Sequence, residues 1–318
     1  MAQPINQHTS IEQLSVPSDI KTPLIERYGI TPVLFAFISL IVIFILYQII
    51  GGIITILLFG YKPSLSNIFG YRIATGLGQI LFIFLPTLIL VRFASFEPSR
   101  YLRLRMPTFQ EITIPIVGIF SLQQMLQIYL VFQDRIPFPE EVQSLMEKFK
   151  EIFEEVYKQL VSTASIPELL SVIFIVALIP AVAEEFMFRG LIQRNFEKGL
   201  TSIWGVIASG VVFGIYHLNP FSFIPLAIIG IYLGFLTFRS DSIWVSVIAH
   251  FINNSLACVS LYLNLNEDYV VFGNSESMST GSLIFTFWFF GIVFIISTYY
   301  FVKITKRHQI KGPDKSFL

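Results

Sequence analysis

The sequence predicts an all-α protein: a polytopic transmembrane helix bundle of about eight spans, with one amphipathic helix outside the membrane. Of its 318 residues, 54% are hydrophobic and only 13% are charged. In an ordinary soluble domain roughly a quarter of the residues are charged. Uncharged runs of roughly 17 to 25 residues, the length that crosses a bilayer as a helix, recur along the chain.

Eight segments have the length and composition of membrane-spanning helices. They cover residues 31–59, 73–91, 112–133, 169–196, 199–218, 220–238, 242–263 and 282–302. The fourth is the only one with carboxylates in its interior. Because we find no internal repeat, we expect residues 31–302 to form a single multi-pass membrane domain.

The two ends of the chain are polar. Residues 1–30 lack a short apolar core after a basic start, so we expect a mobile arm and not a cleaved signal peptide. Residues 303–318 form a basic tail. Lys and Arg gather in the segments on the same side as the two ends, and such loops face the cytoplasm. The single Cys, the short loops and the many Phe and Ile residues are typical of a bacterial protein. We therefore expect a bacterial cytoplasmic membrane protein with both termini in the cytoplasm.

One segment outside the spans has a helical pattern of its own. Over residues 139–160 the apolar side chains recur at three- and four-residue spacing, which predicts an amphipathic helix. Such a helix could lie on the bilayer surface or cap the bundle. We expect a connector that packs its apolar stripe on neighbouring helices, in preference to a dedicated substrate gate.

The stretch "AEEFMFRG" places two adjacent carboxylates inside the fourth span. A charge at the bilayer centre costs at least about 2.5 to 3.5 kcal/mol, so neither side chain is expected to face lipid. Glu185 stands four residues before Arg189, the favourable order for an ion pair within a helix. Glu184 points roughly 100° away around the helix and needs a different partner.

Two of the four histidines, His217 and His250, lie inside predicted spans. Phe213 is four residues before His217 and can pack on its ring, while Asn254 is four residues after His250 on the same helix face. Counted from the cytoplasmic helix ends, Glu184, His217, His250 and Asn254 lie at depths of about 21, 22, 14 and 20 Å. We therefore expect these four residues to meet in one cavity within the membrane. Cys258 lies in an apolar helix, where packing is its expected role.

These residue types suit hydrolysis of a peptide bond. A carboxylate kept in a poorly solvated cavity is a stronger base than in water, so Glu184 could take a proton from a water molecule. His217 could orient that water or share its proton. His250 and the Asn254 amide could donate hydrogen bonds to the oxyanion that forms.

This scheme needs no cofactor, but a metal-dependent alternative stays open. Glu184, His217 and His250 could instead bind zinc, since one Glu with two His is a known ligand set. The motifs HExxH, GxSxG and paired CxxC are missing from the sequence.

Three motifs in order on successive spans resemble the CPBP family. They are EExxxR as "EEFMFR" from Glu184, FxxxH as "FGIYH" ending at His217, and HxxxN as "HFINN" from His250. The family comprises the type II CAAX prenyl endopeptidases, also described as intramembrane metalloproteases or glutamic endopeptidases, and the bacteriocin-processing or Abi proteins. The resemblance covers about residues 165–260.

The resemblance implies an intramembrane endopeptidase. By it, Glu184 matches the residue that activates water, His217 its partner, and His250 with Asn254 the oxyanion pair. Glu185, Arg189 and Phe213 would support them. The implied partners are a peptide or lipidated protein substrate and membrane lipids, with no role for nucleic acid.

Two other classes of function would use the same polar residues. A binding or immunity protein could hold a peptide or an ion in the cavity without cleaving it. A proton-coupled transporter also needs Glu and His within the membrane, although such transporters commonly carry inverted repeats. A cleavage assay distinguishes both from a peptidase.

Overall fold

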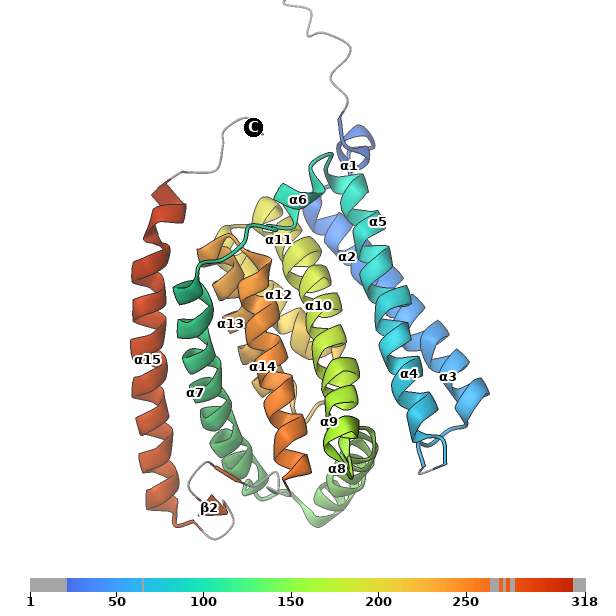
Figure 1. Cartoon of the computed structure of the whole chain (residues 1–318), viewed down its shortest axis with the longest axis vertical. Helices are drawn as coiled ribbons and strands as arrows, with labels where there is room; N and C mark the ends of the chain where they lie inside the picture. Colours follow the sequence, from blue (N-terminus) through green and yellow to red (C-terminus); the bar gives the residue numbers. More distant parts are fainter. Residues whose placement is uncertain (1–21, 65, 264–268, 271–272, 275–277, 311–318) are drawn as a thin grey trace, which may run out of the picture.

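The computed structural model describes residues 22–64, 66–263, 269–270, 273–274 and 278–310. It shows an all-α bundle whose long helices run side by side along one axis (Figure 1). Seven of the helices in the described ranges are long and apolar enough to cross a membrane. The predicted multi-pass helix bundle is confirmed.

The first four spans correspond to the predicted ones, with ends shifted by up to five residues. The first consists of α2 (Pro32–Phe44), the π-helical turn η1 (Ile45–Gly51) and α3 (Gly52–Phe59); the second of α4 (Ile68–Gly78), η2 (Gln79–Phe84) and α5 (Leu85–Ala94); and the third of α7 (Phe109–Asp134). The fourth runs without interruption through α9 (Ile166–Val172), η3 (Ile173–Leu178), α10 (Ile179–Glu185), η4 (Phe186–Ile192) and α11 (Gln193–Gly199).

The last four predicted spans correspond to α12 (Ser202–Tyr216), α13 (Phe223–Ser240), α14 (Ile243–Tyr262) and α15 (Thr280–Ile310). The smaller elements are α1 (Leu24–Arg27), α6 (Pro98–Tyr101), β1 (Tyr269–Val270) and β2 (Gly273–Asn274), the last two paired antiparallel. The first described helix, α1, and the C-terminal end of α15 lie at the same end of the bundle (Figure 1).

The fifth span is shorter than the sequence predicts. Helix α12 has 15 residues, or about 22 Å at 1.5 Å per residue, less than the roughly 30 Å of a bilayer core. The Thr201 side chain caps its first turn by accepting a hydrogen bond from the Trp204 amide. At the other end Leu218 has a φ of 54°, a left-handed conformation that ends a helix, and Pro220 follows. His217 therefore caps α12 and does not lie inside it.

Helical structure extends into both polar ends of the chain where the structure describes them. Most of the expected N-terminal arm, residues 1–21, lies outside the described residues, but α1 belongs to the bundle because Ile25 is buried. At the other end α15 continues to Ile310, eight residues beyond the predicted end of the span.

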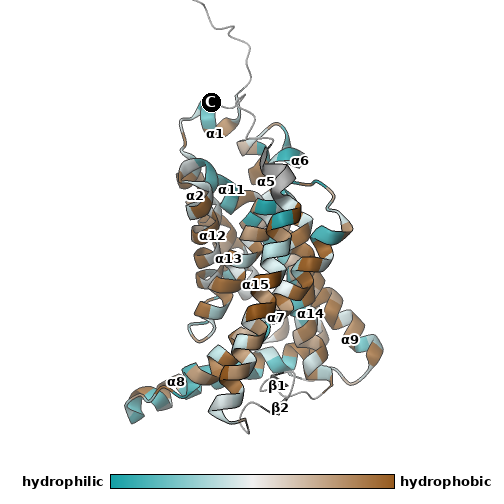
Figure 2. Cartoon of the chain, turned by 90° about the vertical axis from the view of Figure 1, so that its left-hand side faces the viewer, coloured by the Kyte–Doolittle hydropathy of each residue, from teal (hydrophilic) through white to brown (hydrophobic). Residues whose placement is uncertain are grey.

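The amphipathic segment forms α8 (Glu140–Val161), which crosses the end of the bundle opposite to α1 and extends past it (Figure 2). The expected packing of its apolar stripe is wrong for most of its length. Val142, Leu145, Phe149, Ile152 and Phe153 are exposed, Met146 is half-buried, and among the described residues of α8 only Val161 in the last turn is buried. The reason is its position, since no other described helix runs alongside the projecting part.

Helices α12 and α13 pack with almost no space between their backbones. A Cβ atom added to Gly210 would come within 2.4 Å of the Ile231 amide nitrogen, and one added to Gly230 within 2.8 Å of the Gly210 carbonyl oxygen. Small residues at four-residue spacing allow such an approach in membrane helices. This contact fixes the helix that ends at His217 against its neighbour.

An ion-pair network closes the end of the bundle that carries α6 and α11. Arg103, with a φ of 56°, contacts Glu197 of α11 and, at 3.1 Å, Asp241 between α13 and α14. Its carbonyl oxygen accepts a hydrogen bond from the Ile243 amide. Burial opposes the charge of Arg103, but the two carboxylates more than offset it and raise the pKa of the guanidinium. The loop before α7 is thereby tied to three other spans.

Candidate active site

A buried charged cluster lies at the junction of α10, η4 and α14. Glu185 Oε2 is 3.1 Å from Arg189 Nε, and neither side chain is exposed. The ion pair predicted from their spacing is present, although these two atoms do not form a hydrogen bond. Glu185 Oε1 also lies 2.9 Å from His250 Nδ1. Glu185 is therefore shared between a residue of its own span and a histidine of another.

Arg189 completes this cluster through its remaining contacts. Its Nη2 donates a hydrogen bond of 2.9 Å to the Gly230 carbonyl oxygen of α13. The guanidinium carbon also lies 4.7 Å from the centre of the Phe213 ring, within the range of a cation–π contact. Because a buried charge is costly unless several groups compensate it, these contacts explain how Arg189 is kept inside the bundle.

Glu184 points to a different set of residues, as its position on the helix predicts. Its Oε2 lies 3.9 Å from His217 Nε2, and the two side chains are 13% and 29% exposed. This separation is too long for a direct hydrogen bond. The two polar atoms therefore face each other at a distance, on side chains that are both partly exposed.

The other ring nitrogen of His217 determines what its Nε2 can do. Nδ1 lies 2.7 Å from the Phe213 carbonyl oxygen, which can only accept a hydrogen bond. Nδ1 must therefore carry the proton. In the neutral ring Nε2 is then an acceptor aimed toward Glu184, the arrangement needed to receive a hydrogen bond from a water molecule.

Phe213 links the two parts of the site. Its ring centre lies 4.5 Å from that of His217 and 5.8 Å from that of His250. Its backbone orients His217, and its ring face covers Arg189. The predicted packing of Phe213 on His217 is present, and the same side chain also contacts the buried cluster.

Two residues that the motifs do not include extend the site toward the first two spans: Gln79 contacts Glu184, and Tyr47 contacts Gln79. Gln79 Nε2 donates hydrogen bonds of 3.2 Å to Glu184 Oε1 and 3.3 Å to the Tyr47 hydroxyl. Tyr47 lies in η1 and Gln79 begins η2, and π-helical turns often occur at functional sites. The available signal was an amide within an otherwise apolar span, "GLGQILFIF".

Asn254 lies one turn beyond His250 on α14 and is half-buried. Its Oδ1 accepts a hydrogen bond of 3.3 Å from Asn253 Nδ2. Among the described residues no hydrogen bond joins Asn254 to Glu184, His217 or His250. The structure thus brings Glu184 to His217 and Glu185 to His250, with Phe213 between them, while Asn254 shares only the helix of His250.

The donor set of the zinc alternative is divided between these two parts. Over the ranges that the structure describes, no three His, Cys, Asp or Glu side chains gather closely enough to hold a metal ion. His250 turns Nδ1 to Glu185, whereas Glu184 faces His217. Cys258 is buried against Val161 and Val172, a position that suits packing.

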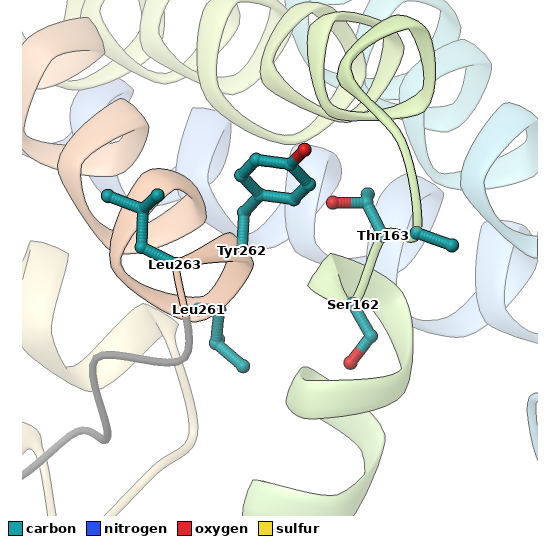
Figure 3. Close-up of a pocket in the computed structure, with 6 residues that line it drawn as sticks. Ser162, Thr163, Leu261, Tyr262 and Leu263 are labelled. Atoms are coloured by element: carbon teal, nitrogen blue, oxygen red, sulfur yellow. The ribbon is translucent and has the colours of Figure 1, made fainter.

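A hollow of about 600 Å³ opens at the end of the bundle near α8. It is lined by Ser162, Thr163 and Ala164 before α9, and by Leu261, Tyr262 and Leu263 at the end of α14. Thr163 and Tyr262 lie on opposite sides of it (Figure 3). The hollow lies about two turns beyond Asn254 on α14.

Comparison with known families supports the resemblance seen in the motifs. Residues 166–256 match the family described as type II CAAX prenyl endopeptidase Rce1-like. The matched segment holds Glu184, Glu185, Arg189, His217 and His250, together with Asn254. The first three spans and the last one lie outside it. No curated protein and no solved structure gave a match.

Proposed function

We propose that this Rce1-like membrane protein is an intramembrane endopeptidase in which Glu184 and His217 activate a water molecule. The observation that carries the proposal is the 3.9 Å separation of Glu184 Oε2 and His217 Nε2, which belong to two partly exposed side chains. It is supported by the family match over residues 166–256. The two atoms are acceptors, so a water between them can donate one hydrogen bond to each and keep a lone pair free.

The reaction then follows from the protonation of these groups. As the water oxygen bonds to the peptide carbonyl carbon, Glu184 takes one of its protons and the carbonyl electrons move to the oxygen. The tetrahedral intermediate collapses by breaking the C–N bond. The proton held by Glu184 passes to the leaving amine, which restores the carboxylate.

His250 and Asn254 are proposed to stabilise the oxyanion. Because His250 Nδ1 already faces the Glu185 carboxylate, its Nε2 can donate a hydrogen bond only when both ring nitrogens are protonated. Glu185, held by Arg189, supplies the negative charge that compensates this imidazolium. The Asn254 amide, one turn further along α14, supplies the second donor.

The proposed substrate is a peptide that enters the membrane domain, either free or attached to a lipid. The family description names a prenyl endopeptidase, which makes a prenylated C-terminal peptide the first substrate to test. In this scheme zinc has no role. Metal analysis with and without a chelator tests that part: activity that depends on one zinc per chain would replace the scheme by the metal-dependent one.

The experiment is a cleavage assay on prenylated and unprenylated peptide libraries with purified protein in lipid. Wild type should cleave at least one class of peptide, while Glu184→Gln and His217→Ala should lose activity. Loss of a general base costs about 10²- to 10⁴-fold. The matched control is Glu97→Gln, which removes an exposed carboxylate near α6. Full turnover by folded Glu184→Gln would refute the proposed base, and binding without cleavage by wild type would favour an immunity or binding protein.

A further inference from the structure

Helix α8 exposes most of its apolar face. It has 22 residues, and its large apolar side chains recur on one side of the helix. Val142, Leu145, Phe149, Ile152 and Phe153 are 38 to 57% exposed. A soluble protein seldom leaves such a continuous stripe in water. The stripe therefore needs a partner.

In the described part of the chain, the bundle contacts α8 at its C-terminal end and near its middle. At the C-terminal end Val161 is buried with Leu169 and Val172, and Arg72 Nε donates a hydrogen bond of 2.8 Å to the Leu160 carbonyl oxygen. Near the middle Lys150 Nζ pairs with Asp134 at 2.6 Å. These contacts use the backbone, the last turn and the polar side, so they leave the apolar stripe free.

The position of α8 indicates what covers the stripe. The helix follows α7, which ends at Asp134, and leads into α9, which begins at Ile166. The end of α7 and the start of α9 are therefore ends of two membrane spans, and they lie on the same side of the bundle. Figure 2 shows α8 lying across these ends and projecting beyond the other helices. At the ends of its spans, a membrane helix bundle is surrounded by the headgroup region of the bilayer.

The charge of α8 sets the kind of lipid surface that it fits. Between residues 140 and 161 the helix carries six Glu and three Lys, a net charge of −3. Helices that bind anionic membranes are instead rich in Lys and Arg on the polar face. Attraction to anionic lipids therefore cannot hold α8, and the apolar side chains must do so.

We propose that α8 is an interfacial helix, with its apolar stripe buried in a neutral bilayer surface at the end of the bundle opposite to α1. A helix of this kind inserts its apolar face about 5 to 10 Å into the boundary between headgroups and acyl chains. The Lys150–Asp134 ion pair and the buried last turn fix its rotation so that the stripe faces the membrane. This role does not depend on the proposed peptidase activity.

The experiment places fluorescent labels on the two faces of α8 in the full-length protein. In a Cys258→Ser background, single cysteines replace Phe149 in the stripe and Glu151 on the opposite face. Each variant is labelled with bimane and reconstituted in phosphatidylcholine, with or without bromine atoms near the headgroup end of the acyl chains. The label at 149 should be quenched by brominated lipid and that at 151 much less.

A second pair, Leu145→Cys and Glu147→Cys, guards against a local folding defect at one position. Replacing part of the lipid by phosphatidylglycerol should not increase quenching. Equal, weak quenching on both faces would overturn the proposal. A buried label at 149 that brominated lipid does not quench would also overturn the proposal if its fluorescence changes as the protein is diluted with lipid. In that case a second copy of the chain would cover the stripe.

Discussion

At the scale of single residues, the two adjacent glutamates of the fourth span have different surroundings. Glu185 is fully buried and faces two basic groups, Arg189 and His250. Glu184 is partly exposed and faces an acceptor nitrogen and an amide. A step of 100° around the helix accounts for the difference, because it turns the two side chains toward different neighbouring spans.

Glu185→Gln should reduce folding at least as much as catalysis. The substitution leaves Arg189 buried without its carboxylate, and breaking a buried ion pair costs about 3 to 5 kcal/mol. We expect a lower yield and a lower Tm in detergent than for wild type. A normal Tm with lost turnover would instead assign Glu185 to the reaction itself.

Gln79→Leu should slow turnover without a comparable effect on substrate binding. Gln79 donates a hydrogen bond to Glu184, and a bond to a charged group contributes about 1.5 to 3 kcal/mol. If its role is to position Glu184, kcat should fall roughly 10- to 100-fold while KM changes little. Steady-state kinetics on any cleaved peptide measures both constants.

The matched control for Gln79 is Gln48→Leu. Gln48 is a half-buried amide next to Tyr47 in η1, with no hydrogen bond among the described residues. Its kcat should stay close to that of wild type. An equal loss of kcat in both variants would show that Gln79 serves packing alone. A lower Tm with unchanged kcat in Gln79→Leu would show the same.

At the scale of helices, the position of His217 depends on the short helix α12 and its contact with α13. The helix ends at Tyr216 because a left-handed Leu218 and Pro220 follow. Because α12 is shorter than a bilayer core is thick, we expect the irregular backbone after it to lie at membrane depth. Such backbone is tolerated only where protein or water covers it, a condition that suits a site where water reacts.

Gly210→Ala should destabilise the bundle by about 1 to 3 kcal/mol, the usual cost of forcing atoms into a packed interface. The added methyl group would meet backbone atoms of α13, which cannot move independently. Gly52→Ala is the control, since a Cβ there meets no atom within 4 Å. Thermal unfolding in detergent should separate the two variants. Equal Tm values for the two variants would mean that α12 and α13 are less closely packed than the structure shows.

At the scale of the whole molecule, the two ends of the bundle differ in chemistry. The end near α1 and α6 carries the Arg103, Glu197 and Asp241 network. The opposite end carries the acidic helix α8 and the hollow near Tyr262. Since basic loops face the cytoplasm, we expect the α1 end to be cytoplasmic and α8 to lie on the other side.

Cysteine labelling tests this orientation. In a Cys258→Ser background, Ser99→Cys near α6 should react with a membrane-impermeant maleimide only when the cytoplasmic face is accessible. Glu151→Cys in α8 should react only from the opposite face. Labelling of both from one side would contradict the arrangement, and a reversed pattern would contradict the assignment of the cytoplasmic end.

The sequence by itself determined the helical membrane fold, the approximate limits of the spans and the Glu185–Arg189 pair. These follow from composition and from spacing within one helix, which are local properties. Only the tertiary structure decided that His250 contacts Glu185, that Gln79 links Glu184 to Tyr47, and that α8 leaves its stripe exposed. Those contacts join spans far apart in the chain, so they depend on how the helices pack and not on the spacing of residues within any one of them.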